Sequence, residues 1–162
     1  MSNIQLPQAA GNEIARALSY DPALAEAFRG LSDAVRHAGI DPRLHELVRM
    51  RVAQINECLY CQAFREPGAV QAGVTEDLLA LVADWRESPA FSEAERVALE
   101  YTERFVRDSP NIDAALFARL HASFSDSEIV VLTAAIAKYM AWGRFVQVLD
   151  LEQDSCSVVP AA

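Results

Sequence analysis

Residues 46–65, ELVRMRVAQINECLYCQAFR, contain two of the three cysteines of the chain, Cys58 and Cys61, spaced as C-L-Y-C. Cysteines three positions apart lie on the same side of a helix, where their side chains are neighbours. Such a dithiol closes into a small disulfide ring that stores two electrons, and the thiolate that opens it is a nucleophile. The spacing therefore favours a thiol-based redox site. We expect a helix to start near Cys58, because the unpaired N–H groups of a helix start favour a thiolate.

Two other interpretations of the cysteine pair stay open. The thiols could be small buried hydrophobic side chains, or they could form half of a zinc site. A complete zinc site needs two further ligands, and the sequence has no second C-x-x-C and no H-x-x-x-H. A close cysteine pair in a reducing compartment is more often catalytic or metal-binding than structural, so we favour redox chemistry.

Length and composition predict one compact domain. The chain has 162 residues, of which 52% are hydrophobic and 23% are charged, and this is enough for a single core. We expect no membrane span, because charged residues such as Lys138 interrupt the longest apolar runs, and the N-terminus lacks a signal-peptide pattern. A cytoplasmic protein is therefore expected. The net charge of −9 would repel nucleic acids and anionic membranes, so neither is an expected partner.

Nearly every segment repeats its apolar residues with a helical period. Aspartate and serine N-caps, prolines at first helical positions and glycine stops set most of the expected helix ends. The predicted helices cover residues 22–37, 41–55, 58–72, 75–85, 92–108, 113–122 and 125–149, and Pro67-Gly68 should disturb or end the third of them. No run alternates strictly as a strand does. The last helix is apolar nearly all round, which predicts a central place in the fold or at a subunit interface.

The block R-x-x-E-L-V-x-x-R-V-A-Q-I-N-x-C-x-Y-C, residues 43–61, resembles the alkylhydroperoxidase D-like (AhpD-like) family, also called the carboxymuconolactone decarboxylase family. Further segments in the family's order extend the resemblance over residues 22–151. It implies one all-α AhpD-like domain over residues 1–162, with its core at about 22–151. It also implies a homo-oligomer, a trimer or hexamer, with no metal and no bound cofactor. The implied activity is that of an antioxidant peroxidase or a disulfide reductase.

The resemblance also assigns roles to residues. Cys61 would attack the peroxide and become a sulfenic acid, Cys58 would resolve it, and Glu46 would belong to a proton relay. The family relay includes a histidine four residues after the second cysteine, where this chain has Arg65. Arginine cannot shuttle protons near neutral pH, but its permanent charge can favour the Cys61 thiolate, and it could pair with Glu46. We therefore expect a slower peroxidase that retains disulfide exchange.

Several residues have a simpler interpretation beside the functional one. Tyr60 lies between the cysteines and could lend its hydroxyl to a substrate site, or it could be a packed aromatic. On spacing alone, Glu46 is more simply a solvated charge at a helix N-terminus. His45 should point about 100° away from Glu46 around the helix. Cys156 has no neighbouring cysteine in the tail and is expected to be a bystander or a site of unwanted oxidation.

The sequence thus leads to three hypotheses of different classes. We favour a thiol-dependent oxidoreductase that reduces a hydroperoxide or disulfide and regains electrons from a dithiol protein or a small thiol. The second is a carboxymuconolactone decarboxylase-type lyase acting on a lactone from aromatic breakdown, which would not need a dithiol. The third is a helical scaffold whose cysteines only sense redox state. Thiol loss on peroxide treatment separates the first from the lyase, and turnover separates it from the sensor.

Overall fold

A computed structural model describes residues 2–151 of the chain, so the expectation for Cys156 lies outside the described residues. Residues 2–151 form helices and turns without a β-strand, which confirms the all-α fold. The elements, in which η marks a short 3-10 helix, are α1 (Glu13–Leu18), α2 (Pro22–Arg36), α3 (Pro42–Ile55), α4 (Leu59–Ala63), α5 (Pro67–Gln71), α6 (Glu76–Ala80), η1 (Leu81–Asp84), α7 (Glu93–Asp108), η2 (Ser109–Asn111), α8 (Ala114–Ser123) and α9 (Asp126–Val148).

The helix starts agree with the local signals in the sequence. The Asp21 carboxylate accepts hydrogen bonds from the first N–H groups of α2, and Pro22 takes the first helical position. α7 and α9 both begin with a complete capping box, as at Ser92 and Glu95. Three predictions were incomplete. α1 was not predicted, the helix expected over residues 58–72 is divided into α4 and α5, and the helix expected over residues 75–85 is α6 followed by the 3-10 helix η1.

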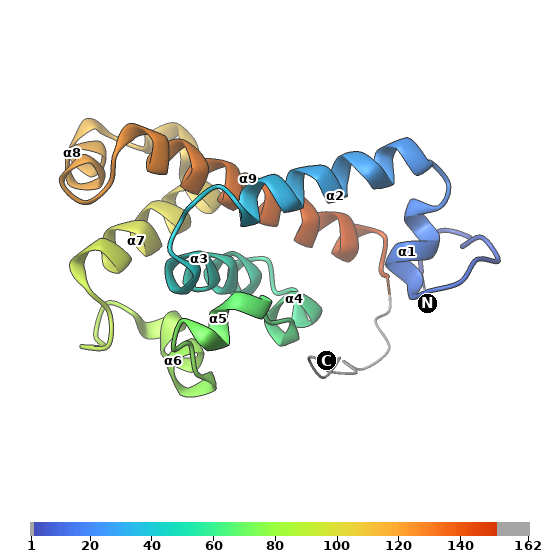
Figure 1. Cartoon of the computed structure of the whole chain (residues 1–162), viewed down its shortest axis with the longest axis horizontal. Helices are drawn as coiled ribbons and strands as arrows, with labels where there is room; N and C mark the ends of the chain where they lie inside the picture. Colours follow the sequence, from blue (N-terminus) through green and yellow to red (C-terminus); the bar gives the residue numbers. More distant parts are fainter. Residues whose placement is uncertain (1, 152–162) are drawn as a thin grey trace.

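Helix α3 lies at the centre of the domain (Figure 1). It packs against α7 and α9 on its two long sides and against α4, α5 and η1 elsewhere. Ten consecutive residues, 44–53, are buried, so the helix has no solvent-facing side over this length. Four of the ten, His45, Glu46, Arg49 and Arg51, are polar or charged. The expectation that Glu46 is a solvated charge is therefore wrong.

Charged side chains are tolerated around α3 because partners from other elements bind them. Arg51 forms an ion pair with Glu103 of α7 at 2.5 Å. Arg86 and the Trp85 indole also donate to that carboxylate, at 2.6 and 3.1 Å. Burial alone would raise the pKa of Glu103, but the donors outweigh it and hold the pKa below the ordinary value. This cluster ties α3 to α7.

Helix α9 combines a core side with an exposed apolar side. It packs against α2, α3, α7 and α8, with Leu132, Ala135 and Ile136 buried. Val130 and Val148 are 67% and 69% exposed. By length and composition alone α9 could cross a membrane, contrary to the expectation that no run could do so. Its packing in the domain is the alternative explanation for the same apolar sequence.

Candidate active site

The two cysteines meet where the chain turns from α3 into α4. Glu57 makes the turn with a φ of 54°, in the left-handed region, and Cys58 then caps the N-terminus of α4. Cys58 and Cys61 are joined by a disulfide, and the Cys61 N–H donates to the Cys58 sulfur at 3.2 Å. These observations confirm that the pair lies at a helix start with its sulfurs adjacent. The two cysteines differ in environment, because Cys58 is 6% exposed whereas Cys61 is only half-buried.

Glu46 is fully buried and forms an ion pair with Arg49; it lies nearly three helical turns before Asn56, the residue that ends α3. Two guanidinium nitrogens of Arg49 donate to the two Glu46 oxygens, each at 2.7 Å. The arrangement is bidentate, the geometry in which arginine binds a carboxylate most strongly. The sequence analysis missed Arg49, although its position three residues after Glu46 is a local signal for such a pair.

Arg49 connects this ion pair to the cysteine segment. Its guanidinium donates to the backbone carbonyl of Cys61 and, at 2.8 Å, to that of Phe64. Phe64 is extended, with a ψ of 146°, and ends α4. Glu66 is extended as well, as expected for a residue before proline, and this explains why the predicted helix stops here and resumes as α5. Glu46 thus acts on the cysteine segment through Arg49 and its backbone bonds.

Arg65 is engaged on a different side of the cysteine segment. Its guanidinium donates to both carboxylate oxygens of Glu76, the first residue of α6, at 2.7 and 2.6 Å. The pairing with Glu46 that the sequence suggested is made by Arg49 instead, because Arg49 lies on the same helix as Glu46. Arg65 is also absent from the lining of the cavity described next. Its expected influence on the Cys61 thiol remains a prediction, and Glu76 offsets part of its charge.

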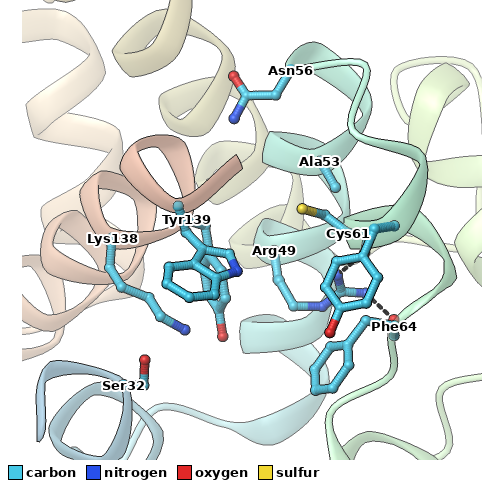
Figure 2. A pocket seen from close by; sticks show the side chains of 10 residues that line it. Ser32, Arg49, Ala53, Asn56, Cys61, Phe64, Lys138 and Tyr139 are labelled. Atoms are coloured by element: carbon cyan, nitrogen blue, oxygen red, sulfur yellow. Dashed lines mark hydrogen bonds between the residues drawn. The ribbon is translucent and has the colours of Figure 1, made fainter. Parts of the chain in front are cut away.

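A cavity of about 190 Å³ adjoins Cys61. Figure 2 shows its lining, with the Cys61 sulfur turned toward α9. Aromatic side chains from α4 and α9 form much of the wall, and Tyr60 is among them, as the functional interpretation of that residue requires. The lining residues are Ser32, Arg49, Ala53, Asn56, Tyr60, Cys61, Phe64, Lys138, Tyr139 and Trp142. Glu46 is absent from this list, so it does not face the space in which a substrate would lie.

A polar network begins at the α9 wall of the cavity, with the lining residue Tyr139. The Tyr139 hydroxyl donates to Glu66 at 2.9 Å and is 3.0 Å from Nε2 of His45. Arg36 of α2 donates to the other oxygen of Glu66 at 3.1 Å. Sequence analysis placed His45 away from Glu46 but did not find this network, because its members come from four separate segments. Lys138, beside Tyr139, was also missed as a site residue.

Burial sets the protonation states in this network. It lowers the pKa of His45 to about 4, and neighbouring Lys138 and Arg49 add to the effect. Burial would raise the pKa of Glu66, but the Tyr139 and Arg36 donors outweigh it and hold that pKa below its usual value. Burial and the Glu66 charge raise the pKa of Tyr139. At neutral pH the network therefore contains a neutral imidazole, a neutral phenol and a carboxylate.

The described residues offer no obvious metal centre. Within residues 2–151, no group of three or more His, Cys, Asp and Glu side chains is arranged to hold a metal ion. The zinc interpretation of the cysteine pair consequently lacks the two further ligands that it requires in this part of the chain. The site is best described as a disulfide beside an aromatic-walled cavity that contains one amine.

Comparison with known proteins agrees with this fold. The model of the carboxymuconolactone decarboxylase family matches residues 22–104. The uncharacterised protein YnjA of Escherichia coli (strain K12) is 34% identical over 125 residues, covering 77% of this chain and 69% of that protein. Among solved structures, ATU0492 of Agrobacterium tumefaciens has unknown function and is a candidate antioxidant defence protein AhpD. It superposes with a TM-score of 0.77 at 27% identity, over 86% of this chain and 97% of that one.

A second structure extends the likeness in fold alone. The alkylhydroperoxidase AhpD core of a peroxidase-related protein from Ralstonia eutropha JMP134 has a TM-score of 0.75 at 17% identity, over 88% of this chain and 76% of that one. The family model covers half of the chain, and the two structures superpose on 86% and 88% of it. The chain belongs to the carboxymuconolactone decarboxylase family and has its AhpD-like helical fold.

Proposed function

We propose that this protein is a thiol-dependent oxidoreductase that reduces a hydroperoxide, or more slowly a disulfide, with Cys61 as the attacking thiol and Cys58 as the resolving thiol. The observation that carries the proposal is the contrast between the two bonded cysteines. Cys61 lines the cavity, whereas Cys58 is buried behind it. A substrate in the cavity can therefore reach one sulfur, and the other is within bonding distance of it.

The proposed cycle balances without a bound cofactor. The reduced Cys61 thiolate attacks the outer peroxide oxygen, the O–O bond breaks, and Cys61 becomes a sulfenic acid while an alkoxide leaves. The alkoxide takes a proton and departs as the alcohol, and the Tyr60 hydroxyl on the cavity wall is the candidate donor. The Cys58 thiol then attacks the Cys61 sulfur and releases water, which closes the disulfide. A dithiol protein or small thiol reduces it.

Glu46 and Arg65 have supporting roles in this proposal. Glu46 positions Cys61 through Arg49, because both of its carboxylate oxygens are occupied by that guanidinium and it does not face the cavity. Arg65 carries the permanent charge nearest in sequence to Cys61, but its ion pair with Glu76 weakens its influence. The absence of a histidine at this position supports a rate below that of the family's peroxidases. Both roles differ from the relay that the resemblance implies.

Assembly and location complete the proposal. α9 leaves large apolar side chains exposed, among them Val130 and Val148, and a second copy of the chain would cover them. We propose a homo-oligomer, a trimer or hexamer, in the cytoplasm, where thiol reductants would restore the dithiol. The lyase alternative rests on the family description and leaves the disulfide without a purpose. In the sensor alternative the same disulfide would form, but the protein would not consume hydroperoxide in repeated cycles.

Turnover assays with cysteine variants test the proposed function. Cumene hydroperoxide consumption would be followed with dithiothreitol as reductant, in a Cys156→Ser background that retains only Cys58 and Cys61. Cys61→Ser should remove the activity, and Cys58→Ser should leave a sulfenic acid on Cys61 that dimedone traps. A Cys61→Ser protein as active as its parent would refute the assignment. Disulfide formation without repeated turnover would favour the sensor, and decarboxylation of a lactone by the Cys61→Ser protein would favour the lyase.

A further inference from the structure

Lys138 is the one lysine among the 14 basic residues of the chain, and it lies in the cavity wall. Every other cation is an arginine, which is a permanent charge. The ammonium group of Lys138 is 3.7 Å from the centre of the Tyr139 ring, a cation–π contact. Figure 2 shows its side chain extending from α9 toward Ser32 of α2, while Cys61 comes from the opposite wall. The only lysine side chain of the chain therefore lies across the cavity from the reactive sulfur of Cys61.

The ammonium of Lys138 makes no direct ion pair, unlike the guanidinium groups of its neighbours. Arg49 is matched by Glu46, and Arg36 is matched by Asp33 at 2.9 Å and Glu66 at 3.1 Å. Among residues 2–151, no carboxylate lies within ion-pair distance of Lys138. Four charged groups act on its ammonium from a longer distance. Asp33 of α2 and Glu66 at the start of α5 attract it, whereas Arg36 of α2 and Arg49 of α3 repel it.

Burial makes this arrangement unfavourable for an empty cavity. It lowers the pKa of Lys138 to about 8; Glu66 and Asp33 oppose the shift, whereas Arg36 and Arg49 add to it. A methionine side chain has a similar size and would fill the same position without burying a charge, so packing alone does not require a lysine here. An anion bound in the cavity would offset this burial by pairing with the ammonium directly. Of the two cations that line the cavity, Arg49 is already bound to Glu46 and only Lys138 has no direct ion-pair partner, so a monoanion suits this space better than a phosphate dianion.

We propose that Lys138 binds a carboxylate on the substrate, so that the cavity takes a small hydroperoxide with an aromatic or similarly apolar body, its carboxylate at Lys138 and its peroxide at Cys61. This inference rests on the proposed function and specifies its substrate class. The walls of Tyr60, Phe64 and Trp142 match the apolar body, and the volume of about 190 Å³ restricts it to a small molecule. The carboxylate does not react. It orients the peroxide toward sulfur.

Two matched hydroperoxides test this specificity. Cumene hydroperoxide is neutral, and its para-carboxylate analogue differs by one anionic group. The parent protein should prefer the carboxylate in kcat/KM by roughly 10-fold to 100-fold, mostly through KM, since a hydrogen bond to a charged group contributes on that order. Lys138→Met should reduce the ratio to near one, and Lys138→Arg should restore part of it. Arg144→Met removes a charge from an exposed position on the same helix and should keep the parent's ratio.

Direct binding separates this inference from the proposed function. The fluorescence of Trp142 on the cavity wall would be followed while 4-isopropylbenzoate or neutral isopropylbenzene is added to the oxidised protein. Tighter binding of the carboxylate by the parent but not by Lys138→Met supports the inference even if no hydroperoxide is turned over. Equal affinity for the two ligands, or a preference that survives Lys138→Met, would overturn it even if peroxidase activity is present.

Discussion

Arg49 joins a fully buried Glu46 to the backbone of the segment that carries the cysteines. Its guanidinium binds both oxygens of that carboxylate at 2.7 Å and donates to the carbonyls of Cys61 and Phe64. A single side chain therefore connects the central helix to the middle and the end of α4. The reactive cysteine, Cys61, is positioned from inside the core, and this explains why an acidic residue fifteen positions upstream belongs to the site.

Replacing Glu46 should damage both stability and activity. Glu46→Gln would leave the Arg49 charge buried without its partner, which costs about 3–5 kcal/mol in the free energy of unfolding. Peroxidase turnover should fall with it, because Cys61 loses its anchor. Urea denaturation of the reduced proteins measures the first effect.

The exposed ion pair of Arg65 supplies the control for that variant. Glu76 is 75% exposed at its side chain, so Glu76→Gln should change the free energy of unfolding by less than about 1 kcal/mol. If both glutamine variants lose the same stability, the Glu46–Arg49 pair does not anchor the site. The double variant Glu46→Gln/Arg49→Met should regain part of the loss, since it no longer buries an unpaired charge.

His45 should make the fold sensitive to mild acid. Its pKa is about 4 in the folded state and about 6.5 in an unfolded chain. As the pH falls from 6.5 to 4, the unfolded chain gains a proton that the folded protein refuses, so stability decreases by up to roughly 3 kcal/mol. Below pH 4, His45 causes no further loss of stability. Protonation of Glu66, whose pKa is held low in the folded protein, also decreases stability as the pH falls.

Chemical denaturation at pH 4.5 and pH 7 measures this effect. His45→Gln should flatten the dependence between those values, while His121→Gln, at an exposed position, should not. A parent protein that is equally stable at both pH values would show that His45 is not held neutral in the fold.

The left-handed turn before Cys58 offers a stabilising substitution. Glu57 has a φ of 54°, a conformation that costs a non-glycine residue roughly 1–2 kcal/mol. Glu57→Gly should therefore raise the free energy of unfolding by about 1 kcal/mol, whereas Glu57→Ala, which keeps a Cβ in that conformation, should not. Thermal unfolding of the three proteins distinguishes the cases, and a loss of stability in the glycine variant would contradict the assignment of strain to Glu57.

Gly143 marks a close contact between α9 and the end of α3. A Cβ built there would lie 2.7 Å from Nδ2 of Asn56, which lines the cavity, so Gly143→Ala should destabilise the protein by about 1–3 kcal/mol. Gly30, in α2, has open space around the same position, and Gly30→Ala should stabilise that helix by about 1 kcal/mol. If alanine is tolerated equally at both positions, Asn56 can move aside without cost.

Local signals in the sequence predicted most of the fold. Asp21, Ser92 and Ser125 act through hydrogen bonds to residues two or three positions away, so the helix starts could be predicted from the sequence. The break at Phe64 was harder to place, because it depends on Arg49 binding a carbonyl fifteen residues later as well as on Pro67. α1 escaped prediction as a short helix of six residues.

The site was predicted only where its chemistry is local. Cys58 and Cys61 followed from their spacing. The burial of Glu46 could not be predicted, because α3 is covered by α7 and α9, whose positions no local pattern reveals. The link between Tyr139 and Glu66 spans 73 residues and has no periodic signal. Lys138 did have one signal in the sequence, since it is the only lysine of the chain.

The most direct test of the central claim is a single-turnover count of thiols. Reduced Cys156→Ser protein would be mixed with one molar equivalent of cumene hydroperoxide, and both free thiols and the alcohol product would be measured. We predict that each chain loses two thiols and forms one alcohol as Cys58 and Cys61 close their disulfide. Two thiols that remain titratable while the hydroperoxide persists would contradict the account.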